Sequence, residues 1–343
     1  MQHMKALKPA RKPGSRTAVL VIVAVACGFL GTYFLTASHA ATPTLSKEVE
    51  SGTVSSPAGS ANDTTASGGK AVKFNSGSTA DACSSFPALP ATKPTAANSG
   101  IPAGTTLTDA GSITVTTAGT VVDAMNVSGG ITVSADNVTI KNSKITTSGY
   151  YGISIGSGVT GTKILHNEIY TASGGYTGIA GDGPNETICG NYVHGWENGM
   201  TLTGGDMMVQ ANFIEKLQSN QSGPHYDGIE LYAGSHNQFW GNNIMMTDPG
   251  GNWLEETGAI NVTGQWSVVD DTLIHGNWLG GGSFTLNLDD GQGYAVTNLS
   301  ITDNSFYGSG PAGHAQYGPA RESELATTWS GNTWSDTGQT VTP

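Results

Sequence analysis

The chain has few charged residues, and positive charge is the scarcest: 14 Lys and Arg stand against 26 Asp and Glu in 343 residues. The first 100 residues carry nine Lys and Arg and four Asp and Glu, a balance of +5, whereas residues 101–343 carry five and 22, a balance of −17. Because non-specific binding to nucleic acid or anionic lipid needs clustered Lys and Arg, we do not expect either as a partner. An acidic polysaccharide would also be repelled, unless a bound cation such as Ca²⁺ reverses the local field.

Charged residues make up only 12% of the chain and glycine contributes 49 residues, which argues against helical bundles and a doubly wound sheet. Cysteine is scarce as well. Cys27 lies in an apolar run near the N-terminus, which leaves Cys83 and Cys189 for the rest of the chain. A disulfide and two free thiols are both consistent with this pair, since geometry decides between them.

Long apolar runs are missing except at residues 18–35. Five Lys and Arg precede this run, and Ser38-His39-Ala40 follows it. The pattern predicts a secretory signal peptide over residues 1–40 with cleavage after Ala40. The run is also close to the length of a membrane span, so an uncleaved anchor is the alternative. Either way we expect an exported protein, secreted or anchored at the cell surface, that touches the membrane only through this segment.

In place of these features the sequence has a repeat, in which Asn is followed two positions later by a large apolar residue. The seven Asn are Asn167, Asn191, Asn212, Asn242, Asn277, Asn304 and Asn332, and Asn142 joins them if one extra residue is admitted. The spacings are 25, 24, 21, 30, 35, 27 and 28 residues, typical of a solenoid with insertions at its corners. Asn tolerates the left-handed backbone of a sharp corner, and stacked amides can hydrogen-bond, so we interpret the series as structural.

Short strands alternate with these corners from Thr105 onward. Thr, Val and Ile recur with period two, as in residues 112–116 and 131–133, and second strands open with glycine, as at residues 152–155, 199–202 and 228–231. Strands this short must stack, at about 4.8 Å from coil to coil, to bury their apolar side chains. With right-handed crossovers, the sequence predicts an all-β fold, a right-handed parallel β-helix, over residues 105–343.

Two segments precede the predicted β-helix. Residues 47–52 and 66–74 resemble the opening strands of a family 6 carbohydrate-binding module, which implies a short β segment over residues 41–75 but none of the module's sugar-binding loops. Residues 76–104 are rich in Ser, Ala, Pro and Gly, and we expect them to form a mobile linker or an extended lead-in.

Three motifs carry a wider resemblance: residues 94–108, residues 137–143, and His225-Tyr226-Asp227-Gly228-Ile229-Glu230. Through them residues 86–310 resemble the exported right-handed β-helix proteins of the pectin lyase-like superfamily, in a bacterial branch with a His-x-Asp-Gly-Ile motif. The resemblance implies the fold and a polysaccharide-related setting, but no particular reaction. Asp289-Asp290 is similar to the acidic pair of polygalacturonase-type hydrolases, yet their Gly-His-Gly and Arg-x-Lys elements are not in the sequence. Arg321 and Lys216 are also poor matches to the base of pectate-lyase-type enzymes.

The third motif predicts an acidic site. If Ile229 and Leu231 face the core, Glu230 faces solvent, and a corner at Gly228 would free the residues before it from strict alternation. Aligning the coils places Glu255, Glu256 and Thr257 beside His225, Tyr226 and Asp227, and Asn261 beside Glu230. Asn287 follows one coil further, and Asp289-Asp290-Gly291 forms the next corner.

Several roles are open to this cluster. The candidate catalytic residues are His225, Asp227, Glu230, Glu255 and Glu256, because paired carboxyl groups cleave glycosidic bonds and like charges raise one pKa to give a proton donor. The candidate substrate-binding residues are Tyr226, Tyr232, Trp253, Asn261 and Asn287, since flat rings bind sugar faces. Asp289 and Asp290 are candidate Ca²⁺ ligands, with no cofactor at all as the alternative. A solvated acidic edge without function is the other interpretation.

We therefore expect a monomer that acts on an extracellular polysaccharide, by carboxylate acid–base hydrolysis or by Ca²⁺-assisted elimination. The alternatives are a non-catalytic glycan-binding protein or adhesin and a purely structural spacer, because the fold alone does not choose between them. The acidic charge favours a neutral glycan unless Ca²⁺ mediates binding.

Overall fold

A computed structural model describes residues 58–62, 70–74 and 81–343. The predicted signal peptide or anchor, residues 1–40, lies outside the described residues. Of the part of the chain that is described, no helix is long and apolar enough to cross a membrane. The chain divides into two units, Met1–Gly77 and Ser78–Pro343, which are considered separately.

The described residues of the first unit form an antiparallel strand pair. Strand β1 (Ala58–Asn62) pairs with β2 (Lys70–Phe74), with Ala58 opposite Phe74. Strand β2 falls in the second of the two stretches that resemble a carbohydrate-binding module, whereas residues 47–52 lie outside the described residues.

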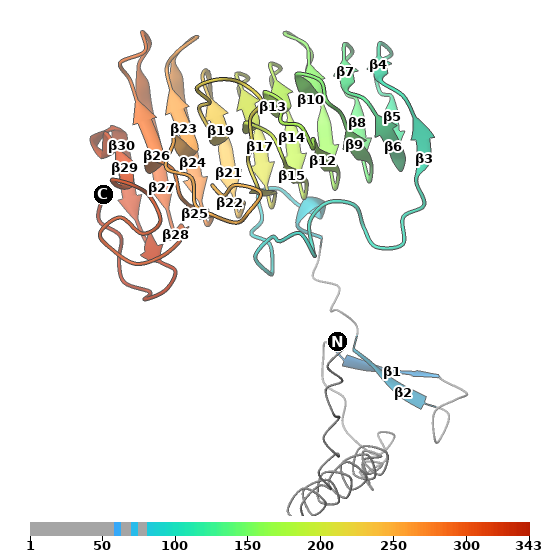
Figure 1. Ribbon diagram of the computed structural model, residues 1–343, viewed down its shortest axis with the longest axis horizontal. Helices are drawn as coiled ribbons and strands as arrows, with labels where there is room; N and C mark the ends of the chain where they lie inside the picture. Colours follow the sequence, from blue (N-terminus) through green and yellow to red (C-terminus); the bar gives the residue numbers. More distant parts are fainter. Residues whose placement is uncertain (1–57, 63–69, 75–80) are drawn as a thin grey trace, which may run out of the picture. The chain divides into compact units, whose positions relative to one another are not determined.

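The second unit is a right-handed parallel β-helix built from three parallel sheets, as the sequence predicts (Figure 1). Each coil runs through sheet 1, sheet 2 and sheet 3 in turn. Sheet 1 contains β4 (Ile113–Val115), β7 (Ile131–Val133), β10 (Tyr151–Ile155), β13 (Thr177–Gly181), β16 (Asn198–Leu202), β19 (Asp227–Leu231), β23 (Gly258–Thr263), β26 (Phe284–Asp289) and β29 (Gly318–Arg321).

Sheet 2 contains β5 (Val121–Asp123), β8 (Thr139–Lys141), β11 (Lys163–Leu165), β14 (Thr187–Cys189), β17 (Met208–Gln210), β21 (Gln238–Trp240), β24 (Val269–His275), β27 (Val296–Thr302) and β30 (Ala326–Ser330), and β20 (Gly234–Ser235) pairs with β24. Sheet 3 contains β3 (Thr108–Ala110), β6 (Met125–Ser128), β9 (Lys144–Thr146), β12 (Glu168–Tyr170), β15 (Tyr192–His194), β18 (Phe213–Glu215), β22 (Asn243–Met245), β25 (Trp278–Gly280), β28 (Ser305–Phe306) and β31 (Thr333–Trp334). Two short 3-10 helices are η3 (Ala82–Ser84) and η4 (Ser323–Leu325).

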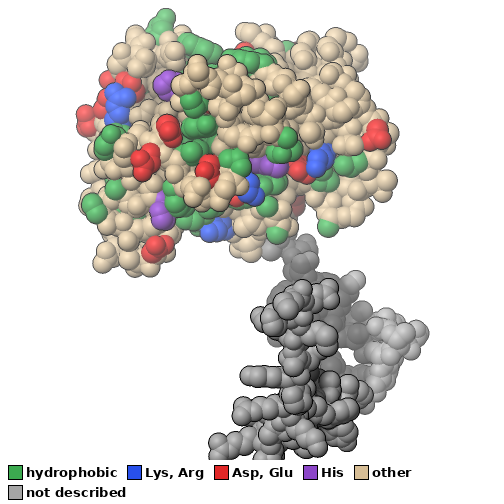
Figure 2. All heavy atoms as spheres, in the orientation of Figure 1, with side chains coloured by type: hydrophobic (Ala, Val, Ile, Leu, Met, Phe, Trp, Pro, Cys, Tyr) green, Lys and Arg blue, Asp and Glu red, His purple; other side chains and the backbone are tan. Residues whose placement is uncertain are grey.

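The core is a column of apolar side chains from successive coils. In sheet 2, Ile140 pairs with Ile164 and Ile164 with Ile188, and all three are fully buried. Sheet 3 repeats the pattern with Ile145, Ile169 and Val193. β-branched side chains suit this arrangement because they pack well on a pleated surface. On the face drawn in Figure 2, charged side chains are scattered among uncharged polar groups and backbone, as the low charge content implies.

The repeated Asn residues form a buried ladder at the corner between sheets 2 and 3. Asn242 is representative: its Oδ1 accepts hydrogen bonds from the main-chain N–H and the Nδ2 of Asn212, at 3.0 and 2.9 Å. Its Nδ2 donates to the carbonyl of Val209 at 2.9 Å and to Oδ1 of Asn277 at 3.0 Å. The ladder continues without a break from Asn167 to Asn332, and every one of its amides is fully buried. The structural interpretation of the series is therefore confirmed.

Two details of that interpretation are wrong. The left-handed residue of each corner is the one before the ladder Asn, for example His166 at φ 54° before Asn167 and Ala211 at φ 54° before Asn212. Asn142 takes this preceding position, at φ 50°, and is not a rung. The rung in its coil is Ser143, whose N–H donates to Oδ1 of Asn167 at 3.0 Å. The Asn side chain is selected for its four hydrogen bonds rather than for its backbone conformation.

Residues 81–104 are an extended lead-in packed along the coils rather than a mobile linker. A disulfide joins Cys83 to Cys189 at the end of β14, with a Cα–Cα distance of 5.8 Å, and settles the choice that the sequence left open. Further along, Nε2 of Gln210 donates to the carbonyl of Ser85 at 3.1 Å, and Nδ2 of Asn243 donates to that of Pro94 at 2.7 Å.

Substituting a central rung tests the ladder. In Asn242→Ala, the N–H and Nδ2 of Asn212 lose their acceptor and the carbonyl of Val209 loses its donor, all in the buried interior. Because each unpartnered buried group costs about 1–3 kcal/mol, we expect the free energy of unfolding to fall by about 3–5 kcal/mol in urea titration. Asn126→Ala, which removes one surface hydrogen bond to Asp109, should cost less than about 1 kcal/mol. Equal losses in the two variants would contradict the role of the ladder.

A second buried polar group lies at the corner before β14. Glu186 is 1% exposed, its Oε1 accepts the N–H of Gly183 at 2.9 Å, and its Oε2 has no partner among the described residues. Burial raises the pKa of Glu186 to about 8, and the charge of Asp182 acts in the same direction. The folded protein therefore holds a proton here that the unfolded chain, with its ordinary pKa of 4.5, releases earlier.

This raised pKa predicts a stability that is greatest below pH 4.5 and falls as the pH rises toward 8. Glu186→Gln cannot ionise, so its free energy of unfolding should exceed that of the wild type at pH 9 by about 3–5 kcal/mol and should match it near pH 4. Urea titrations across this range provide the measurement. The exposed Glu324→Gln serves as the control and should leave the pH dependence unchanged.

Candidate functional site

The predicted site lies on the outer face of sheet 1, where one side chain from each coil forms an outward row. Register pairs Thr201 with Glu230, Glu230 with Asn261, Asn261 with Asn287, and Asn287 with Arg321. The pairing of Glu230 with Asn261 and the continuation to Asn287 confirm the predicted alignment. Strict alternation produces this row, because Ile229 and Leu231 on either side of Glu230 are fully buried in the core.

Gly228 brings Asp227 onto the same face. A Cβ at Gly228 would lie 2.2 Å from the side chain of Ile244 and 2.4 Å from the carbonyl of Ala259, so this position points into the core and has no room for a side chain. Because Ile229 also points inward, the alternation is broken at Gly228 and Asp227 is released outward. The release of Asp227 from the alternation is as predicted, but the predicted corner at Gly228 is wrong, because Gly228 lies within strand β19.

These side chains surround a cavity of about 520 Å³. Of the residues nominated from the sequence, the ones lining it are His225, Asp227, Glu230, Tyr232, Asn261, Asn287 and Asp289. The site that the alignment of coils predicted is therefore assembled in large part.

Glu230 accepts hydrogen bonds from three side chains, although it is only 3% exposed. Its Oε2 accepts hydrogen bonds from Nδ2 of Asn198 at 3.0 Å and from Oγ1 of Thr201 at 2.7 Å, and its Oε1 accepts one from the hydroxyl of Tyr232. Burial is the largest influence and raises the pKa of Glu230, while the bonds from Tyr232 and Thr201 oppose it.

Asp227 is also buried, at 1% exposed, but it differs from Glu230 in its hydrogen bonds. Neither of its carboxyl oxygens has a hydrogen-bond partner among the described residues. Burial raises the pKa of Asp227 well above its ordinary value, and the negative charge of Glu230 raises it further. Glu230, which accepts three side-chain hydrogen bonds, is therefore the easier of the two carboxyl groups to ionise.

A third acid, Glu197, lines the cavity and is 6% exposed. Its Oε1 accepts the main-chain N–H of His225 at 3.2 Å, and its Oε2 accepts the hydroxyl of Ser219. The charge of Glu197 contributes to the raised pKa of both Asp227 and Glu230. The cavity therefore brings three acidic side chains together, and two of them, Asp227 and Glu230, have raised pKa values.

Arg321 closes the far end of the outward row. Its guanidinium lies 3.2 Å from Oδ2 of Asp289 and 2.8 Å from Oε1 of Glu322. Burial works against ionisation of Asp289, but hydrogen bonds from Gln292 and Gly291 and the charge of Arg321 hold its pKa below the usual value. The oxygens of Asp289 are thus already occupied by protein donors.

The other nominated residues lie away from the cavity. Register pairs Asp227 with Gly258, not with Thr257, so the alignment of this segment is wrong by one residue. Glu255 and Glu256 are exposed and do not line the cavity, and neither does the exposed Asp290. Tyr226 is half-buried and packs against the core. Trp253 stacks on His314 with ring centroids 4.3 Å apart, on the side of the molecule formed by sheet 3.

Sequence reasoning did not nominate several of the lining residues, namely Tyr176, Glu197, Asn198, Thr257, Thr263, Gln265, Gln292 and Arg321. A signal existed for two of them. Asn198-Gly199 occupies the same register as Asp227-Gly228, so aligning one coil backward would have found Asn198 and its neighbour Glu197. Arg321 has no such signal, because it lies 32 residues after Asp289 and outside any repeated motif.

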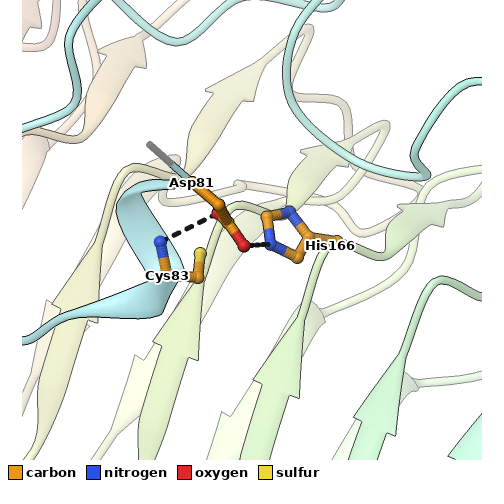
Figure 3. A group of neighbouring side chains, drawn as sticks. All are labelled: Asp81, Cys83 and His166. Atoms are coloured by element: carbon orange, nitrogen blue, oxygen red, sulfur yellow. Dashed lines mark hydrogen bonds and ion pairs between the residues drawn. The ribbon is translucent and has the colours of Figure 1, made fainter. Parts of the chain in front are cut away.

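One more cluster has the composition of a metal site: Asp81 and Cys83, at the start of the lead-in, lie beside His166 of the β-helix (Figure 3). Oδ1 of Asp81 accepts the N–H of Cys83 at 2.9 Å, and Oδ2 lies 3.1 Å from Nε2 of His166. Because the sulfur of Cys83 is bonded to Cys189, it supplies no thiolate ligand. The cluster therefore anchors the lead-in and does not form a metal centre.

Comparisons with known proteins do not assign a function to this site. No protein-family model, no curated protein and no solved structure matches this chain significantly.

The raised pKa of Asp227 predicts that Asp227→Asn stabilises the fold at high pH. A buried carboxyl with a raised pKa favours the folded state below its unfolded pKa and loses that advantage as the pH rises through the folded value. The variant should therefore unfold at a higher urea concentration than the wild type at pH 9 and at a similar one at pH 4.

The control for this experiment is Asp248→Asn, where hydrogen bonds from Asn252 lower the pKa of an exposed carboxyl. The effect of this substitution should have the opposite sign, a slight destabilisation above pH 4. A loss of stability at pH 9 in Asp227→Asn would show that Asp227 is ionised in the folded protein.

Proposed function

We propose that this protein is an exported, polysaccharide-active enzyme that hydrolyses a glycosidic bond, on a β-helix of the pectin lyase-like type. The observation that carries the proposal is the buried carboxyl of Asp227, which has no hydrogen-bond partner among the described residues, has a raised pKa and lines the cavity beside Glu230. A carboxyl group that keeps its proton to a higher pH is suited to act as a general acid.

Asp227 is the proposed acid. Its carboxyl O–H donates a proton to the glycosidic oxygen as the bond from that oxygen to the anomeric carbon breaks. Neither oxygen of Asp227 has to give up a protein hydrogen bond to do this, because neither makes one. The burial that raises its pKa keeps the proton on Asp227 to a higher pH, so that it is present for transfer.

Glu230 and Glu197 have separate roles in this proposal. Glu230 is fully engaged with Asn198, Thr201 and Tyr232, so it acts as a positioning residue whose charge keeps the proton on Asp227. Glu197 accepts the proton of the water molecule that adds to the anomeric carbon. Exchange with solvent then returns a proton to Asp227 and removes one from Glu197, which balances the reaction.

The charges of the cavity support a neutral glycan as substrate. Four acids line it, Glu197, Asp227, Glu230 and Asp289, and the single lining cation, Arg321, is already paired with Asp289 and Glu322. An added uronate would meet this negative field without a free cation to balance it. Hydrolysis is favoured over Ca²⁺-assisted elimination because both oxygens of Asp289, a candidate Ca²⁺ ligand, already accept hydrogen bonds: Oδ1 from the N–H of Gly291, and Oδ2 from Gln292 and Arg321.

Turnover of a glycan panel by the full-length protein tests the proposal. We expect a neutral polysaccharide to be shortened, with or without a Ca²⁺ chelator, and the products to gain one reducing end per bond cleaved. Asp227→Asn should reduce the rate by about 100- to 10,000-fold, the contribution of a general acid. Glu230→Gln should move the loss of activity at high pH to a lower pH, because the charge that helps raise the pKa of Asp227 is gone.

The matched control is Glu255→Gln. Glu255 is an acid that was nominated from the sequence, but it is exposed and lies outside the cavity. It should retain wild-type activity. Binding without any product would support a glycan-binding protein instead, and products that carry a new double bond and form only with Ca²⁺ would support elimination.

A further inference from the structure

Three tyrosines next to the cavity form a cluster that the chemistry above does not use. Tyr150 is 56% exposed and Tyr151 is 39% exposed, whereas Tyr176 is half-buried. The rings of Tyr150 and Tyr176 are stacked, with centroids 4.8 Å apart and an interplanar angle of 18°. Tyr151 meets Tyr150 edge-on, with centroids 4.8 Å apart at 87°. We call these three residues the tyrosine cluster.

The tyrosine cluster lies along sheet 1 from the acids. Register pairs Tyr151 with Thr177, Thr177 with Asn198, and Asn198 with Asp227. Three interstrand steps separate Tyr151 from Asp227, which is about 14 Å. Tyr176 spans the interval, since it stacks on Tyr150 and also lines the cavity. Burial raises the pKa of Tyr176, and the charge of Glu230 raises it further, which reflects how near this ring lies to the acids.

We propose that the tyrosine cluster is a docking subsite for the sugar rings of a neutral polysaccharide chain that leads into the acidic cavity. The class of ligand rests on the proposed function, whereas the location of the subsite rests on the exposed rings alone. The ring faces and edges of Tyr150 and Tyr151 offer apolar surface against which the C–H faces of a pyranose can pack. Their hydroxyl groups supply hydrogen bonds to sugar hydroxyls at the edge of the same surface.

The electrostatics of the tyrosine cluster point to an uncharged chain. Besides burial and the neighbouring tyrosines, the charges that raise the pKa of Tyr151 and Tyr176 are those of Asp182, Glu230 and Glu197, all of them negative. A polyuronate would therefore be repelled at the subsite as well as in the cavity. Tyr150 and Tyr151 keep a substantial exposed fraction, so their side chains contribute less to folding than fully buried tyrosines would.

Affinity electrophoresis of the full-length protein separates binding from catalysis. The probes are native gels containing a mixed-linkage β-glucan, a glucomannan, an arabinoxylan or polygalacturonate. We expect at least one neutral polymer, and not polygalacturonate, to retard the wild type. Tyr150→Ala combined with Tyr151→Ala should weaken that retardation at least about tenfold in dissociation constant, as expected for ring anchors in a binding site. Tyr150→Phe with Tyr151→Phe should keep most of it, because the rings remain.

Matched controls keep the two proposals apart. Tyr294→Ala removes another exposed ring, 48% exposed and outside the cavity lining, and should bind like the wild type. Asp227→Asn should still be retarded although it lacks turnover. Retardation without turnover in the wild type would overturn the enzyme and keep the subsite. Equal retardation of the wild type and the double Ala variant, retardation by polygalacturonate alone, or none by any polymer would overturn the subsite.

Discussion

The column of buried asparagines between sheets 2 and 3 is the constraint on which the rest of the molecule depends. Each amide joins its own coil to the coils before and after it, as Asn242 does with Asn212, Val209 and Asn277. Buried amides tolerate no slip, because a shift by one residue would leave donors and acceptors without partners in an apolar interior. The corner therefore fixes how neighbouring coils align, while the loops elsewhere are free to vary in length.

That alignment is what gathers the acids. Glu230 lies 29 residues after Thr201 and 31 before Asn261, yet the three side chains are neighbours on sheet 1 because their coils are held in register. Burying Asp227 and Glu230 costs free energy of folding, and the ladder and the apolar column provide the stability that offsets this cost. Buried acids are tolerated at functional sites when the surrounding structure supports them.

The fold could be predicted from the sequence because its signals are periodic. The spacing of the Asn residues identified the coils, and alternation around Ile229 correctly placed Glu230, Asn261 and Asn287 in one row. Alternation did not predict the alignment of residues where the chain leaves the sheets. Glu255 and Glu256 follow a turn closed by the bridge between Thr247 and Trp253, whose length no repeat specifies, so they were aligned one residue out of place. The position of Arg321 in the site could not be predicted for a related reason, because only the stacking of the last coils brings it close to Asp289.

The separation of inward-facing from outward-facing positions has a consequence for how the sequence of a β-helix can evolve. Thr201, Glu230, Asn261 and Asn287 occupy equivalent places on successive coils, and each is flanked by residues that fill the interior. Replacing one of these four changes the outer face locally, at that residue and at the neighbour to which it is hydrogen-bonded, and leaves the apolar residues beneath in place. A β-helix can therefore acquire a new specificity by one substitution at a time on its outer face. Duplication or loss of a whole coil would lengthen or shorten this face without unfolding the β-helix.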